Sequence, residues 1–196
     1  MALTPSIDAG AVYSAAERTQ LLQVARNSIR HGLDHGAQLE VDEHDYPPAL
    51  QAHRACFVTL HRDGSLRGCI GHLEAIQPLV VDVAGNAYAA AFQDPRFPPL
   101  KSSELDAIDL EISVLSVPEP LPFDDREDLL SKIRPGVDGL ILAGPAGHRG
   151  TFLPSVWESL PRAEEFLSNL VLKAGLPMGY WSDDILMQRY TTESFA

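Results

Sequence analysis

The pattern of apolar and polar positions along the chain predicts two long helices in its first half. Apolar residues recur at helical spacing after Ser14 and Glu17, which have the spacing of a capping box, and we expect this helix to end at Gly32 and Gly36. A second helix is expected over residues 79–93, where leucine, valine and alanine alternate with few charges. Its small side chains predict a buried helix that packs closely against its neighbours.

The middle of the chain predicts strands joined by hairpins. Residues 55–61 and 66–70 are expected to form two strands around an Asp63-Gly64 turn, and residues 108–114 alternate between apolar and polar side chains. Such strands, mixed with helices, favour an α+β fold over a doubly wound parallel sheet. The rest of the chain fits this class, with a stiff proline connector at 118–122, a short helix at 128–133, strands at 139–143 and 151–153, a helix at 163–174 and a last strand within 185–195.

The expected hairpin register brings the two cysteines of the chain onto one face. A two-residue turn would place Cys69 opposite Val58, and Cys56 opposite Gly71. The cysteines would then be diagonal neighbours on an apolar face, roughly 7–8 Å apart. Because that separation is too long for an unstrained disulfide, we expect two free thiols.

The sharpest local feature is the run Arg-Gly-Cys-Ile-Gly-His in the second strand of this hairpin. Its cysteine, Cys69, lies between Gly68 and Gly71, and glycines let another backbone or a ligand approach closely. Arg67 falls on the same face in an extended strand, where its charge would stabilise a thiolate. His72 is a candidate base or cationic partner. Since free cysteines are among the most buried side chains, a structural thiol is the alternative.

A proline-rich loop forms the second candidate site. Three prolines within residues 94–99 stop the preceding helix and stiffen the loop that carries Asp94 and Arg96. Arg96 is a candidate clamp for a carboxylate or a phosphate. In the alternative interpretation, the Asp94–Arg96 pair organises only its own loop.

Composition narrows the functional classes. Among 196 residues, 15 Lys and Arg face 27 Asp and Glu, and a net charge of −12 weighs against non-specific nucleic-acid binding. We expect a cytoplasmic protein, because the chain has neither an apolar run of about 18 residues nor a signal-peptide pattern at its start. His31 and His35 have helical metal-ligand spacing, but no third ligand accompanies them, and no metal site is predicted.

Five short blocks, taken together and in order, resemble the AMMECR domain family, whose bacterial members are called AmmeMemoRadiSam system protein A. The resemblance implies two unequal α+β lobes, each with its own mostly antiparallel sheet flanked by helices, and a cleft between them. The larger lobe is expected to contain both termini. We expect one such domain over residues 14–195, after an N-terminal extension of residues 1–13. The matching blocks are 67–71, 94–99, 136–139, 151–154 and 173–177.

The first functional hypothesis is an enzyme or a covalent carrier that acts on a small acidic or peptide substrate. The signature cysteine and arginine of the family match here as Cys69 and Arg67. Cys69 would be the reactive thiolate, Arg67 its electrostatic support and His72 an acid or base. The remaining candidates would bind substrate: Gly68, Gly71, Asp94 and Arg96.

The second hypothesis is a non-catalytic module that binds a partner through the loop at Asp94. The resemblance implies an association with a Memo-like protein and a radical SAM protein, and it identifies neither a reaction nor a cofactor. His72 stands where many relatives have Thr or Ser, so that a Cys–His pair is not a trait of the whole family. Both hypotheses remain open at the level of the sequence.

Overall fold

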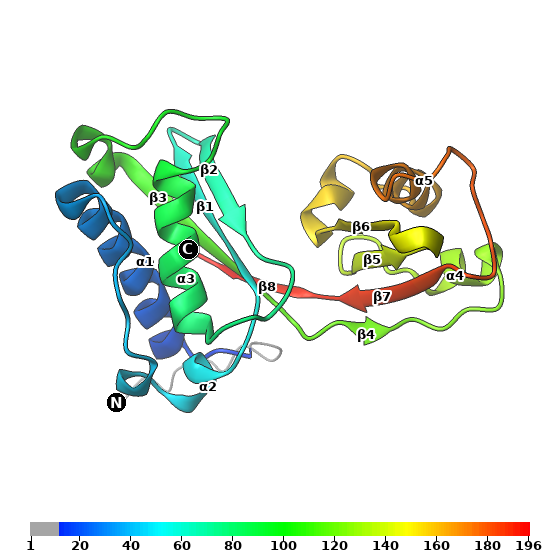
Figure 1. Ribbon diagram of the computed structural model, residues 1–196, viewed down its shortest axis with the longest axis horizontal. Helices are drawn as coiled ribbons and strands as arrows, with labels where there is room; N and C mark the ends of the chain where they lie inside the picture. The colour runs from blue at the N-terminus through cyan, green and yellow to red at the C-terminus, as the bar shows by residue number, and fades with distance from the viewer. Residues whose placement is uncertain (1–11) are drawn as a thin grey trace, which may run out of the picture. The chain divides into compact units, whose positions relative to one another are not determined.

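A computed structural model describes residues 12–196 and divides them into two compact units (Figure 1). The first unit comprises the described residues up to Leu115 together with Glu193–Ala196, and the second comprises Ser116–Thr192. Each unit has its own four-stranded sheet and its own helices, which confirms the predicted α+β class. Of the expected N-terminal extension, residues 1–11 lie outside the described part of the chain.

The first unit packs two long helices on one face of its sheet (Figure 1). The strand order is β2-β1-β3-β8, and β1 pairs antiparallel with both β2 and β3. Apolar side chains that alternate along β1 and β3 meet the helices and form the core. The elements are α1 (Ala15–His35), α2 (Pro48–Gln51), β1 (Cys56–Arg62), β2 (Ser65–Gly71), α3 (Leu79–Phe92), β3 (Ile108–Leu115) and β8 (Thr192–Phe195), with 3₁₀ turns at Glu43–Asp45 and Ser102–Ala107.

Helix α1 begins at the predicted capping box and ends at Gly36, one of the two glycines expected to close it. Ser14 and Glu17 form the capping box, and Gly36 closes the helix in the left-handed conformation with φ of 69°. Gly32, however, lies inside the helix rather than at its end. A Cβ atom there would approach the Phe92 ring to 2.4 Å, so that this glycine makes room for α3 instead of breaking α1.

A β-bulge corrects the predicted hairpin register. Past the turn, the pairing shifts by one residue and leaves Arg67 without an opposite residue in β1. Cys69 therefore pairs with Thr59 and not with Val58. Because side chains alternate between the two faces of a strand, this shift turns Cys69 away from the helix-covered face on which Cys56 is buried. Both thiols are free, as predicted, but they lie on opposite faces.

The second unit combines a smaller sheet with two helices. Its strand order is β4-β7-β5-β6, and the described pairs are antiparallel. In the core of this unit, the ring of Trp157 stacks on that of Phe166 from α5, with 3.8 Å between the ring centroids. The predicted proline connector contains a short strand, because β4 pairs with β7. The elements are β4 (Glu119–Pro120), α4 (Arg126–Lys132), β5 (Gly139–Ala143), β6 (Arg149–Phe152), α5 (Ala163–Lys173) and β7 (Leu186–Tyr190), with 3₁₀ turns at Pro145–Gly147 and Pro154–Glu158.

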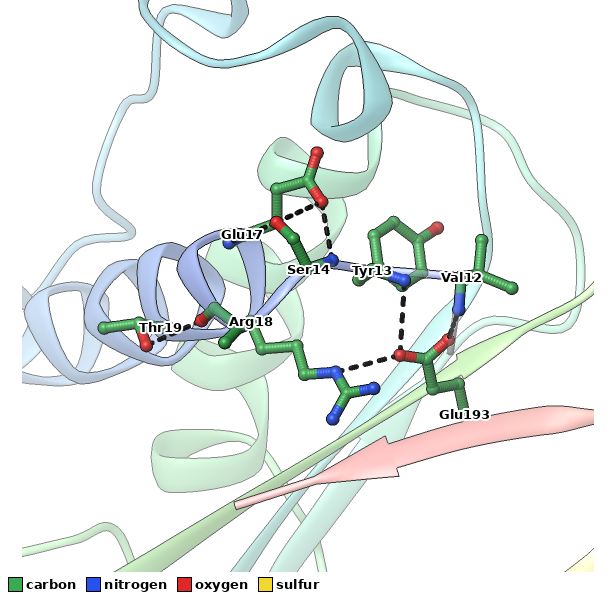
Figure 2. A network of polar contacts seen from close by, with 8 residues as sticks. Val12, Tyr13, Ser14, Glu17, Arg18, Thr19 and Glu193 are labelled. Atoms are coloured by element: carbon green, nitrogen blue, oxygen red, sulfur yellow. Dashed lines mark hydrogen bonds and ion pairs between the residues drawn. The ribbon is translucent and has the colours of Figure 1, made fainter. Parts of the chain in front are cut away.

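The beginning and the end of the described chain are tied together in the first unit. Figure 2 shows the carboxylate of Glu193, in β8, facing the start of α1. It accepts hydrogen bonds from the backbone amides of Val12, at 2.7 Å, and Tyr13, at 3.4 Å. The Nε of Arg18 donates to the same carboxylate at 3.0 Å, and this guanidinium also lies 5.9 Å from the centroid of the Phe195 ring. The last strand is thereby anchored to the first helix.

Gly68 gives a direct test of how closely α3 packs on β2. A Cβ at this position would meet the carbonyl oxygen of Ala90 at 2.2 Å, and a backbone atom inside a helix cannot move aside cheaply. We expect Gly68→Ala to lower the free energy of unfolding, measured in urea, by about 1–3 kcal/mol.

Gly85 provides the matched control within α3 itself. A Cβ there meets only the amide end of the Gln38 side chain, at 3.4 Å or beyond. Since alanine favours a helix over glycine, Gly85→Ala should raise the free energy of unfolding by up to about 1 kcal/mol. Equal stability of the two variants would contradict the close packing of β2 on α3.

Candidate functional site

Cys69 occupies a position on β2 where its sulfur is held but not enclosed. The residue is half-buried on the sheet face opposite α1 and α3. Its cross-strand neighbour Thr59 has its hydroxyl 3.3 Å from the Cys69 Sγ and donates a hydrogen bond to it. This contact fixes the position of the sulfur on that face of the sheet.

The loop after α3 holds the backbone of Cys69. The Oδ2 of Asp94 accepts the Cys69 amide at 2.9 Å, and the Nη2 of Arg96 donates to the Cys69 carbonyl oxygen at 3.2 Å. Because β2 is an edge strand, these two groups would otherwise face outward without a strand partner. Asp94 and Arg96 thus provide Cys69 with the two backbone hydrogen bonds that a further strand would otherwise make.

Asp94 and Arg96 form a closed ion pair. The Nε and Nη2 of Arg96 reach the two oxygens of Asp94 at 2.9 and 2.7 Å, in the bidentate geometry typical of these groups. The Arg96 guanidinium, opposed by burial, holds the pKa of Asp94 far below its usual range, and the Asp94 carboxylate raises the pKa of Arg96. Asp94 is 2% exposed, whereas the Arg96 side chain is 53% exposed. Any anion bound at Arg96 must therefore share it with Asp94.

Arg67 has a different neighbour from the one that the sequence suggested. Its Nε and Nη2 donate to the two oxygens of Glu104 at 3.0 and 3.2 Å, and Nη2 also reaches the carbonyl oxygen of Pro98 at 3.0 Å. Hydrogen bonds from Arg67 first, and then from the Lys101 amide, lower the pKa of Glu104 to about 2. Arg67 thus anchors the proline-rich loop, and its charge is balanced by Glu104 rather than held for a thiolate.

Phe97 lies between the two arginines of the site. Its ring centroid is 6.0 Å from the guanidinium carbon of Arg67 and 5.5 Å from that of Arg96. The loop from Asp94 therefore contacts β2 through two ion pairs and one shared aromatic ring. The fold thus brings together two arginines that lie 29 residues apart in the sequence.

His72 is held by a group that the sequence analysis did not identify. Its Nδ1 lies 2.7 Å from the Oδ1 of Asp82, in the first turn of α3. The hydrogen bonds described for residues 12–196 join His72 to Asp82 and to the Cys56 carbonyl, and none joins it to Cys69. The one signal for Asp82 in the sequence is its position as the lone carboxylate within an apolar helix.

The two glycines of the motif are close to protein atoms. Gly68 faces the backbone of α3, and a Cβ at Gly71 would meet the Phe57 ring and the Cys56 carbonyl oxygen at 2.4 Å each. The close approach expected for a ligand is thus made by the protein itself on these sides. Their role in substrate binding stays a prediction.

Two further features bear on the class of site. Within residues 12–196, no group of three or more His, Cys, Asp and Glu side chains is placed to hold a metal ion. The rings of His31 and His35 pack on each other at 4.4 Å between centroids. In the same part of the chain, no helix has the length and apolar character needed to cross a membrane.

The ion pairs of the loop predict acid sensitivity. The folded-state pKa values of Asp94 and Glu104 are depressed, so both carboxylates stabilise the fold above their unfolded pKa values of about 4. That stability is lost as the pH falls from about 4.5 toward 2. We expect Glu104→Gln to lower the free energy of unfolding at neutral pH by on the order of 2–3 kcal/mol, and to flatten its decline between pH 4.5 and 2.

Asp42→Asn is the control for this acid titration. Asp42 is paired with His44 on the surface, where solvent competes with the contact. Loss of the Asp42 charge should therefore change the free energy of unfolding little. Urea unfolding at a series of pH values measures all three proteins. A Glu104→Gln variant whose pH dependence matches that of the wild type would show that Glu104 does not stabilise the fold as a carboxylate.

Comparison with known proteins identifies the fold and the family. The sequence model of the AMMECR1 family matches residues 22–195. A protein of Methanothermobacter thermautotrophicus is 41% identical over 188 residues, covering 93% of this chain and 95% of the relative. A protein of Thermococcus onnurineus is 42% identical over 186 residues, covering 89% of this chain and 87% of the relative.

A solved structure agrees with these sequence matches. The crystal structure of an uncharacterized protein from Pyrococcus horikoshii superposes with a TM-score of 0.78 at 37% identity, and the match covers 89% of this chain and 88% of the other. The family model spans nearly all of the described residues, including the cysteine motif, the proline-rich loop and the blocks in the second unit. The chain therefore belongs to the AMMECR1 family.

Proposed function

We propose that the chain is an enzyme or a covalent carrier whose nucleophile is the Cys69 thiolate, acting on a small acidic or peptide substrate. The observation that carries this proposal is the β-bulge at Arg67. Without the bulge, Cys69 would point into the core below α3, next to Cys56. Bulges are over-represented next to active sites, where they change the direction of a side chain.

The surroundings of Cys69 support a thiolate in a fixed position. Thr59 donates to the sulfur, and the Asp94–Arg96 pair holds the amide and the carbonyl of the same residue. The partly exposed guanidinium of Arg96 interacts electrostatically with this thiol. A cysteine held through its sulfur, its amide and its carbonyl loses little orientational freedom on reaction, which is the condition for an efficient nucleophile.

Alkylation by iodoacetamide, measured at each cysteine by peptide mass spectrometry across pH 5–10, tests the proposal. Cys56 is the control in the same molecule, because burial and the neighbouring Asp82 raise the pKa of its thiol well above the ordinary value. We expect Cys69 to react in the folded protein and Cys56 to react only after unfolding. Protection of Cys69 to the same degree as Cys56 would show that its thiol is structural.

Thr59→Val is the matched variant for this experiment. Valine keeps the shape of threonine and removes the hydroxyl that donates to the Cys69 sulfur. Since a thiolate loses one donor, the alkylation of Cys69 near neutral pH should slow several-fold, while Cys56 stays protected. An unchanged rate would assign the Thr59 contact to packing alone.

A partner-binding function is the second candidate, and the exposed face of the proline-rich loop supports it. Pro95, Arg96, Pro98 and Pro99 are all exposed, on a loop that the contacts of Arg67 and Asp94 hold rigid. A rigid exposed loop binds without a large cost in conformational entropy. The partners that the family resemblance suggests are a Memo-like protein and a radical SAM protein.

A pull-down with those two proteins, purified from the same source, separates the two functions. If the loop is a docking surface, Cys69→Ala should retain the partner and Arg96→Ala should reduce binding by at least about tenfold. Gly85→Ala serves as the control, because its added Cβ would meet the Gln38 side chain and no residue of the loop. Equal binding by all three variants would argue against a docking role for the loop.

A further inference from the structure

Asp82 is a buried carboxylate surrounded entirely by donors. Its Oδ2 accepts from the Cys56 amide at 3.1 Å, from the Cys56 thiol at 3.3 Å and from the Asn86 amide group at 2.9 Å. Its Oδ1 accepts from the Gln77 side chain at 2.9 Å and lies 2.7 Å from the Nδ1 of the His72 ring. Apart from His72, both oxygens already accept from N–H groups, those of Cys56 and Asn86 at Oδ2 and that of Gln77 at Oδ1, and this arrangement fits the acceptor-only carboxylate.

His72 connects this buried charge to the surface. Asp82 is 1% exposed, whereas the side chain of His72 is 44% exposed. Because an ionised carboxylate can only accept, the Nδ1 of His72 must carry the proton of their shared hydrogen bond. The neutral ring then has its lone pair on Nε2, on the side away from Asp82.

We propose that His72 and Asp82 form an acid–base site that works independently of Cys69. The Nε2 of His72 takes a proton from a hydroxyl group of a substrate or from a water molecule, and the electron pair of the broken O–H bond stays on the oxygen. Asp82 is the positioning residue, which sets the tautomer and stabilises the imidazolium that forms. This is the division of labour between the histidine and the aspartate of hydrolase triads.

The chain contains a second His–Asp pair that lacks the features of a site. His44 and Asp42 are in contact through the same ring atom, Nδ1, at 2.9 Å, and their side chains are 79% and 68% exposed. Water competes for both groups there, so the carboxylate neither orients the ring firmly nor loses its own hydration. The two pairs differ chiefly in the burial of the carboxylate, which makes His44 a matched control for His72.

Nitrogen-15 NMR of the full-length wild-type chain tests the tautomer, with the His72 resonances assigned by loss in His72→Gln. We expect neutral His72 to carry its proton on Nδ1, and His44 to populate both tautomers. A His72 ring protonated on Nε2 would overturn the proposal. This measurement requires no variant at Asp82, so it remains decisive even if Asp82→Asn fails to fold.

Carbethoxylation by diethyl pyrocarbonate at pH 8, followed at each histidine by peptide mass spectrometry, tests the reactivity of Nε2. Asp82→Asn should slow the reaction at His72 by about tenfold, because an asparagine donor favours the wrong tautomer. The rate at His44 should not change. Equal rates at His72 in wild type and a folded Asp82→Asn would show that Asp82 has only a structural role. Alkylation of Cys69 in the same samples reports separately on the proposed thiol function.

Discussion

The hydrogen bond from the Cys69 amide to the buried Asp94 carboxylate is the contact on which the candidate site depends. It joins the loop after α3 to an edge strand that, among residues 12–196, pairs with no other strand on that side. A buried carboxylate is tolerated only where donors and a cation compensate for its lost hydration, and Arg96 supplies both. Because Arg96 also reaches the Cys69 carbonyl, one ion pair holds both backbone groups of the cysteine. A movement of the loop would therefore displace the backbone of Cys69 and, with it, the sulfur.

Helix α3 is joined to the hairpin by a carboxylate near each of its ends. Asp82, in its first turn, accepts the amide of Cys56, and Asp94, just beyond its last turn, accepts the amide of Cys69. The two cysteines, on neighbouring strands, thus mark the two points where the helix is attached. The inward thiol of Cys56 adds a further donor to the buried charge, while the bulge turns Cys69 outward. The same structural arrangement thus gives one fully buried thiol and one half-buried thiol.

Periodicity and capping predicted the elements well because those signals are local. The capping box at Ser14, the alternation over 108–114 and the strand character of the last segment are all confirmed. The register of the hairpin was wrong, since the bulge at Arg67 is stabilised by Glu104 and Pro98, about 30 to 40 residues away in the sequence. Gly32 was misread for the same reason: the rings that require a glycine there belong to another helix. Cys69, Asp94 and Arg96 were found from their motifs, whereas Asp82, Glu104 and Thr59 act through contacts that only the fold creates.

The anchoring of Glu193 at the start of α1 has a consequence for how the chain is made. The second unit is a continuous segment inserted into the first, and the first unit receives its last strand only from residues 192–195. Domains usually complete their folding from the N-terminus onward as synthesis proceeds. Here the order is reversed, because the amides of Val12 and Tyr13 bind a carboxylate that is synthesised only after the whole second unit. The unit that is begun first is thus the one that is finished last.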